Sequence, residues 1–436
     1  MWQRAYLTRL KRDLDLWIER GWVTAANADA ILASAAEPGA ATRRMPSILA
    51  ILGAVLIGFA VMSFVAANWQ EISKLTKIVL IFAAMWTAYG AAILLEKRGH
   101  ANFAQAAVLI GLGLFGAGIM LIAQIYHIVT DDPGGVLAWC VAALATAWLL
   151  SSRAALALGI LLAVIWTWFA IDLNDATPHW EFWFAWAVAA ALALRLSWPP
   201  AFHLVLIAGF LWQAINAEAI IDVTGFSPTQ FAIIVILQAL TLWMAAIAFS
   251  GRGARLAAVA EGYGIVVAFA LVGILQGDPG SGEQAASGAA GAVFIAAAVA
   301  LLAVLAVLGG LAVMRGGLPA RHLSGVAAIA ALAIAYPFLS VTNAALVPWA
   351  YAAAILVLAA WLVAYGASRG SRFAVNFGFV VFAAEVLWLY FETLGTLLDT
   401  AIFFALGGVL LIVGSVVFER MRRRIVRGTA TEGGEA

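Results

Sequence analysis

Residues 111–128 read Gly111-Leu-Gly-Leu-Phe-Gly-Ala-Gly-Ile-Met-Leu-Ile-Ala-Gln-Ile-Tyr-His-Ile128. The first part predicts an apolar helix that contains Gly111, Gly113, Gly116 and Gly118. Because glycines remove bulk from neighbouring turns, we expect a second helix to pack closely there. The last part is polar and consists of Gln124, Tyr126 and His127, followed by Asp131 and Asp132. No other apolar span of the sequence combines a glycine face with so dense a polar end.

The composition of the whole chain is as apolar as this stretch. Hydrophobic residues make up 65% of the 436 residues, charged residues make up 11%, and the mean hydropathy is +1.01. A soluble domain has roughly 25% charged residues, so the composition predicts a polytopic protein that contacts the lipid bilayer. The net charge of +1 gives no sign of nucleic-acid binding. Since Cys140 is the single cysteine, an intrachain disulfide is excluded, and we expect no metal site and no cofactor.

Apolar runs of roughly 17–25 residues, the length that spans a bilayer, recur from residue 48 onward. We expect an all-α bundle of about fourteen transmembrane helices. The number of spans is least certain between residues 135 and 217, where the apolar runs are short. The predicted spans are 48–67, 75–95, 103–127, 135–150, 154–172, 181–196, 201–217, 229–249, 255–275, 288–313, 322–341, 346–366, 374–391 and 399–419.

The basic residues predict which side of the membrane each loop faces. With both termini placed in the cytoplasm, 22 of the 24 lysines and arginines lie on the cytoplasmic side, and only Lys74 and Lys77 lie outside. The predicted outer loops are instead acidic, and they include Glu218 and Asp222. This distribution follows the positive-inside rule and supports both the span count and the cytoplasmic placement of the two termini.

The remaining segments suggest how the chain is divided. Residues 1–36 predict a small cytoplasmic helical hairpin, with Gly21 ending its first helix and Thr24 capping its second. Two such short helices bury little apolar area, so a cytoplasmic protein partner or the membrane surface is expected to support them. A linker follows at 37–47. The predicted bundles are 48–275 and 288–420, separated by a flexible outer loop at 276–287, and a basic tail occupies 421–436.

Three blocks of sequence resemble a known family. They are Leu14-Asp-Leu-Trp-Ile-Glu-Arg-Gly-Trp-Val-Thr24, then Gly53-Ala-Val-Leu-Ile-Gly58 with Ala66-Ala-Asn-Trp69, and finally Gln124-Ile-Tyr-His127. Together they resemble the predicted bacterial membrane proteins of domain of unknown function 2157. The resemblance implies a multi-pass protein of the bacterial cytoplasmic (inner) membrane, but it supplies no reaction, no substrate and no catalytic residue.

The polar end of the third predicted span has two interpretations. In the first interpretation, a proton or ligand path is formed by Gln124, Tyr126 and His127. This path opens into an outer vestibule that contains Asn68, Asp131 and Asp132. If the helix continues past residue 127, His127 and Asp131 form an i, i+4 pair. In the second interpretation the same side chains anchor the helix at the interface and bond to neighbouring helices.

Two acids lie within predicted spans. Glu385 is placed near the middle of a span, where an ionised carboxylate costs about 2.5–3.5 kcal/mol and is therefore expected to face a cavity or a partner. It either serves a proton path or is protonated and bonded to a backbone carbonyl or to a glutamine such as Gln213 or Gln238. Glu261 lies about 9 Å from the cytoplasmic boundary, where snorkelling or interfacial pairing accounts for it.

The function inferred from these features is transport. A transporter- or channel-like protein for a small molecule, a lipid or a proton is favoured, with Glu385 and the Gln124–His127 cluster along the path. The alternative is a membrane scaffold or sensor that recruits a cytoplasmic partner through residues 1–36, and assembly as a homo-oligomer stays open in both. An enzyme is disfavoured, since the sequence contains no nucleotide-binding, zinc-protease or serine-hydrolase motif and predicts no catalytic residue.

Overall fold

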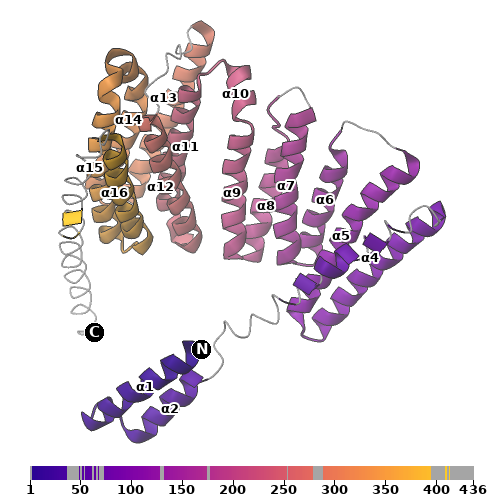
Figure 1. Ribbon diagram of the computed structural model, residues 1–436. Helices are drawn as coiled ribbons and strands as arrows, with labels where there is room; N and C mark the ends of the chain where they lie inside the picture. The colour runs from indigo at the N-terminus through magenta and orange to yellow at the C-terminus, as the bar shows by residue number, and fades with distance from the viewer. Residues whose placement is uncertain are drawn as a thin grey trace. The chain divides into compact units, whose positions relative to one another are not determined.

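The computed structural model is helical throughout the regular structure of the residues that it describes (Figure 1). These residues are 2–36, 73–127, 132–173, 177–252, 254–277 and 288–393, together with 49, 52–53, 55–60, 63–64, 67, 408–409 and 412. The predicted vestibule residues Asn68 and Asp131 lie outside this part of the chain. So do the linker at 37–47, most of the loop at 276–287 and the tail at 421–436.

The helices alternate with short turns along the chain. They are α1 (Trp2–Glu19), α2 (Ala25–Ala36), α4 (Lys74–Lys97), α5 (Ala101–Tyr126), α6 (Gly134–Leu149), α7 (Arg153–Leu173), α8 (Phe182–Leu196), α9 (Pro199–Ile215), α10 (Ala217–Thr224), α11 (Pro228–Ala248), α12 (Ala254–Gly277), α13 (Gly288–Met314), α14 (Leu323–Asn343), α15 (Val347–Arg369) and α16 (Arg372–Thr393). Single 3-10 turns lie at Ser250–Arg252, Ala320–His322 and Ala344–Leu346.

The membrane-protein class is confirmed, whereas the count of about fourteen spans is not. Eight segments of the described chain are long and apolar enough to cross a bilayer. With 16 and 15 residues, α6 and α8 are too short to be counted. The pair α9 and α10 is bent by 53° and gives a ninth span if both helices belong to one crossing.

One of the eight segments, Ala320–Arg369, contains two helices. Its 50 residues would measure about 75 Å as one straight helix, more than twice the roughly 30 Å hydrocarbon core of a bilayer. The segment instead folds back on itself, because the rings of Tyr336 in α14 and Tyr351 in α15 lie 5.6 Å apart. Nearer the start of α14 and the end of α15, the Trp361 indole packs on Gly325. These contacts make α14 and α15 an antiparallel pair.

Contacts between helices divide the chain into two compact units. Unit 1 contains residues 1–173 and 180–208, and unit 2 contains residues 174–179 and 209–436. The boundary between the two units therefore falls within α9. The reason is that α11 and α12 pack on α13–α16 and share one apolar core with them, which includes Trp243, Phe269 and Tyr336.

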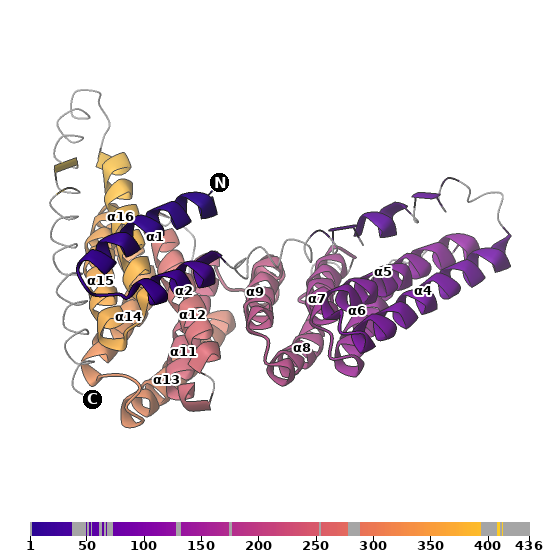
Figure 2. The same cartoon turned by 90° about the horizontal axis from the view of Figure 1, so that it is seen from below.

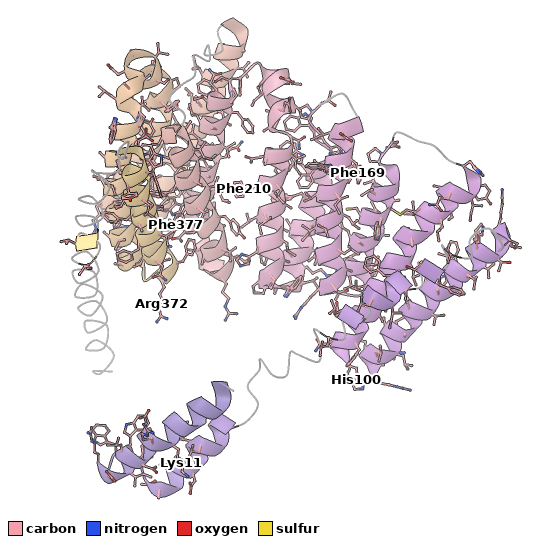
Figure 3. The ribbon with its side chains drawn as sticks, viewed as in Figure 1. Lys11, His100, Phe169, Phe210, Arg372 and Phe377 are labelled. Atoms are coloured by element: carbon pink, nitrogen blue, oxygen red, sulfur yellow. The ribbon has the colours of Figure 1, made fainter. Side chains whose placement is uncertain are left out.

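Unit 1 begins with α1 and α2, which pack on each other by burying Leu14 and Ala28. Between the two helices, Gly21 has φ +72° and Thr24 Oγ1 accepts the backbone N–H of Asn27. Further along, α4 and α5 lie side by side in both views (Figures 1 and 2). The turn that joins them contains His100 (Figure 3).

The segment that contains Glu218 and Asp222 is helical, so the predicted loop there is wrong. Ala219 is buried in α10, while both acids are exposed one helical turn apart and do not oppose helix formation. The break before α10 is at Asn216, whose side-chain N–H donates to the carbonyl of Trp212 and whose Oδ1 accepts the backbone N–H of His179. A buried amide that bonds twice to the backbone thus ends α9 and starts a bent helix.

Candidate functional site

The polar end of α5 is exposed. The helix ends at Tyr126, and His127 follows in the left-handed conformation with φ +53°. Asp131, the predicted i, i+4 partner of His127, lies outside the described residues, so the pair stays a prediction. Gln124, Tyr126 and His127 are all exposed, and the Lys74 ammonium lies 5.9 Å from the centre of the Tyr126 ring. Asp132 Oδ1 accepts the backbone N–H of Gly134 at 3.0 Å, just before α6.

The four glycines of α5 have different surroundings. A Cβ atom at Gly116 would overlap the indole of Trp139, and one at Gly111 would lie 3.1 Å from the Tyr89 ring. At Gly118 it would lie 3.0 Å from Ile81, in α4. No described side chain or neighbouring backbone comes within 4 Å of a Cβ at Gly113, which lines an apolar cavity of about 290 Å³.

Glu385 is buried in unit 2 and bonds to a glutamine that the sequence did not suggest. Gln276 Nε2, near the end of α12, donates to Glu385 Oε1 in α16 at 2.7 Å. Both side chains are buried, with 2% of Gln276 and 6% of Glu385 exposed. The predicted kind of partner is correct, but Gln213 and Gln238 are not the partner. Which glutamine bonds to Glu385 depends on how far α12 and α16 are offset along their axes. The positions of the apolar runs in the sequence do not reveal this offset.

A larger buried polar network occupies the opposite end of α12. Glu261 accepts two hydrogen bonds there: Tyr365 Oη donates to its Oε1 at 2.6 Å, and Arg369 Nη2 donates to its Oε2 at 3.1 Å. Trp243 Nε1 in turn donates to Tyr365 Oη at 2.9 Å. The network thus joins α11, α12 and α15 through one carboxylate. Glu261 itself is buried.

Close helix packing brings these side chains together. A Cβ at Gly264, one turn beyond Glu261, would lie 2.7 Å from the Ala239 carbonyl oxygen and 2.9 Å from Trp243 Cβ. Because Gly264 has no side chain, α12 approaches α11 closely. The Trp243 indole N–H and the Glu261 carboxylate can then both bond to the Tyr365 hydroxyl. The centroids of the Trp243 and Tyr365 rings lie 5.2 Å apart, and the two rings are nearly perpendicular.

The network extends to the turn before α14. Arg369 Nη1 donates to the carbonyl of Gly317, and Ser368 Oγ lies 2.9 Å from His322 Nε2. Three buried polar atoms at this end have no hydrogen-bond partner, namely His322 Nδ1, Trp361 Nε1 and Arg369 Nε. A buried polar atom without a partner costs about 1–3 kcal/mol, so these three atoms are unfavourable for packing alone.

Arginines gather around this network. The residues at this end of unit 2 are Arg255, Arg315, Arg321, Arg369 and Arg372, and we call it the arginine end. Arg315 Nη1 donates to the carbonyl of Ala248 at 2.7 Å, while Arg372 is exposed and projects beyond the start of α16 (Figure 3). Arg369 is the arginine that pairs with Glu261, and the other four are exposed.

The network around Glu261 is larger than the snorkelling or interfacial pairing that the sequence predicts for this acid, because Tyr365 donates to it as well as Arg369. Its pairing with Arg369 follows from the antiparallel order of α12 and α15, and the sequence does not give that order. Tyr365, Trp243 and His322 carried no signal beyond their residue types. The Gln124–His127 cluster lies in unit 1, and both buried acids lie in unit 2.

Comparison with protein families identifies the beginning of the chain. Residues 15–156 match the family described as predicted membrane protein (DUF2157). The match confirms the resemblance read from the sequence and covers the region from α1 to the start of α7. Searches of curated proteins and of solved structures gave no match.

Proposed function

We propose that this membrane protein is transporter- or channel-like and that it moves a proton or a small polar solute through unit 2. The observation that carries the proposal is the pair of buried acids on facing helices, Glu261 with Tyr365 and Arg369, and Glu385 with Gln276. In hydrocarbon an ionisable group is retained at a cost of about 2.5–3.5 kcal/mol, and such groups line ion and proton pathways.

The spacing of the two sites suits a path with a gate. Glu261 and Gln276 lie 15 residues apart on α12, which corresponds to about 22 Å along the helix. Between them, Ile265, Phe269 and Val272 are buried in the apolar core. In the proposed mechanism each acid exchanges protons or ligands with one side of the membrane, and the apolar segment between them separates the two sides.

The proposal includes an orientation. Both termini are cytoplasmic, the chain crosses the bacterial inner membrane about fourteen times, and the arginine end of unit 2 faces the cytoplasm. Glu261 is then reached from the cytoplasm and Glu385 from outside. The distribution of basic residues supports this orientation.

Cysteine labelling tests whether water reaches the acids. In a Cys140→Ser background, single cysteines are introduced at Glu385 and Gln276, with Val272→Cys as a matched control one turn away on the same helix. We expect a membrane-impermeant thiol reagent to label positions 276 and 385 from outside and to leave position 272 unlabelled. Protection of all three positions, in protein whose exposed Asp132→Cys variant is labelled, would rule out the path.

Proton movement tests the role of the carboxylates. In vesicles with an imposed pH gradient and an internal pH dye, the wild-type protein is expected to speed decay of the gradient. We expect Glu385→Gln and Glu261→Gln to slow this decay at least tenfold, whereas Glu392→Gln, an exposed neutralisation on α16, leaves it unchanged. Decay equal to that of protein-free vesicles would count against proton movement and leave a solute as the proposed cargo.

A second function is favoured by α1 and α2. Trp22 is 66% exposed and Leu16 is 43% exposed, although both lie in a charged helix pair. Such apolar side chains suit a cytoplasmic hairpin that recruits a protein partner, as a scaffold or sensor would. Deleting residues 1–36 discriminates between the two functions, because proton or solute movement should survive the deletion while partner recruitment should not.

A further inference from the structure

An apolar groove with a single basic end runs along unit 1. It lies between α6 and α8 and has a volume of about 690 Å³. Its floor includes Leu144 and Leu192, together with Trp166 of α7, all of which are mostly buried. Apart from Glu181 at one end and Arg195 at the other, the side chains that line it are apolar or contribute a thiol. The groove thus offers a long apolar track with opposite charges at its ends.

Arg195 is held at the mouth of this groove. Its Nη1 donates to the carbonyl of Trp148 at 3.3 Å, and its guanidinium carbon lies 5.9 Å from the centre of the Trp148 ring. Arginine has five N–H donors in a planar fork that matches the oxygens of a phosphate. Arg153, at the start of α7, lies at the same end of unit 1 but does not line the groove, so Arg195 is its basic residue.

The dimensions of the groove fit one leaflet of a bilayer. From Arg195 to Phe184, which also lines the groove, α8 extends for 11 residues, or about 16 Å. One leaflet contributes about 15 Å of the roughly 30 Å hydrocarbon core. Moreover, α6 and α8 measure only about 24 and 22 Å, so the surrounding lipids must adapt to helices shorter than the core.

From this geometry we infer that the α6–α8 groove binds one anionic phospholipid, with an acyl chain along the apolar track and the phosphate on Arg195. Glu181 repels a phosphate from the other end, so the charges fix the direction in which the lipid enters. A basic residue near a membrane surface contributes about a fivefold preference for an anionic lipid, which sets the size of the expected effect.

Lipid binding to the purified full-length protein tests this inference. Native mass spectrometry compares phosphatidylglycerol with phosphatidylcholine of identical acyl chains. We expect about fivefold tighter binding of phosphatidylglycerol to the wild type. Arg195→Gln should abolish the preference, while Arg372→Gln, which removes the same charge from the exposed start of α16, should retain it. Ala145→Trp fills the groove and should weaken binding of both lipids.

Photo-crosslinking locates the acyl chain without any substitution. Phosphatidylglycerol with a diazirine in its acyl chain should attach to peptides of α6 and α8, and excess unlabelled phosphatidylglycerol should compete. Crosslinks spread over all exposed helices, equal binding of the two lipids to the wild type, or equal effects of Arg195→Gln and Arg372→Gln would overturn the inference.

Discussion

Unit 1 and unit 2 are both packed from antiparallel apolar helices, but they place their polar groups differently. Among the described residues, seven of the ten buried polar or charged side chains belong to unit 2, including Glu261 and Glu385. Unit 1 instead presents Gln124, Tyr126 and His127 at an exposed helix end and an apolar groove on its surface. The difference teaches where each proposal has its structural basis: buried polar groups are concentrated in unit 2, whereas the groove and the polar helix end of unit 1 lie at its surface.

The largest effect is expected from breaking the ion pair of unit 2, in which Glu261 is buried and Arg369 is half-buried. Arg369→Ala removes the cation that lies 3.1 Å from Glu261 and leaves a buried carboxylate without its charged partner. Losing one member of such a pair costs about 3–5 kcal/mol, so the unfolding free energy should fall by that amount. Denaturant unfolding in detergent measures the loss. Hydrogen exchange should show it in α12 and α15, but not in α4 and α5.

Two further variants keep this prediction specific. Arg372→Ala removes an exposed arginine three residues away and should change stability by no more than about 0.5 kcal/mol. Adding Glu261→Gln to Arg369→Ala removes the stranded charge and should restore part of the lost stability. Similar losses for Arg369→Ala and Arg372→Ala would mean that the pair contributes little, and the contrast between the two units would weaken.

Much of the fold was predictable because a bilayer imposes a length on every helix. Each of the twelve predicted spans from 75–95 to 374–391 coincides with one helix in the structure, within a few residues at most. The pattern could not show that Ala217–Thr224 is helical, because charges every fourth residue fit a loop and a solvated helix face equally well. Nor could it establish how many helices cross the membrane, since length and composition support eight segments.

The candidate sites were less predictable, because they depend on which helices are neighbours. A lone acid in an apolar run identifies Glu385 and Glu261 as unusual, since burial of a charge is costly wherever it occurs. Their partners Gln276 and Arg369 lie 109 and 108 residues away in the sequence. A single sequence contains no information on that pairing. The groove beside Arg195 was missed for the same reason, because it is formed jointly by three helices.

Replacing a glycine at a close helix contact is expected to lower the unfolding free energy in both units. The loss should be smaller than that of Arg369→Ala. Gly116 in unit 1 lies against the Trp139 indole, and Gly325 in unit 2 lies against the Trp361 indole. Because an added methyl group would overlap a ring in either case, Gly116→Ala and Gly325→Ala should each cost about 1–3 kcal/mol. Unfolding in detergent measures both losses.

Gly113 supplies the matched control on the same helix as Gly116. Among the described residues, no atom of a neighbouring helix would lie within 4 Å of its added Cβ, and alanine favours a helix over glycine by about 1 kcal/mol. Gly113→Ala should therefore be neutral or stabilising. A loss at Gly113 as large as that at Gly116 would show that helix flexibility, and not close packing, explains the glycines of α5.

The smallest effects concern the helix caps, where burial again separates the units. Ser73 Oγ accepts the backbone N–H of Thr76 at 3.2 Å at the exposed start of α4. Ser227 does the same for Gln230 at the start of α11, and Gln230 Oε1 accepts the Ser227 N–H at 3.0 Å in return. Removing such a cap costs about 0.5–2 kcal/mol.

Water replaces the lost oxygen more readily at Ser73, which is exposed, than at Ser227, which is half-buried beside the buried Gln230. Ser227→Ala should therefore cost about 1–2 kcal/mol and Ser73→Ala about 0.5 kcal/mol. Hydrogen exchange of the first-turn amides in α11 and α4 measures the two losses separately. Equal losses would mean that water reaches both caps alike, and the start of α11 would then have to be as hydrated as the start of α4. In that case buried polar groups would distinguish unit 2 only deeper in its core, at Glu261 and Glu385.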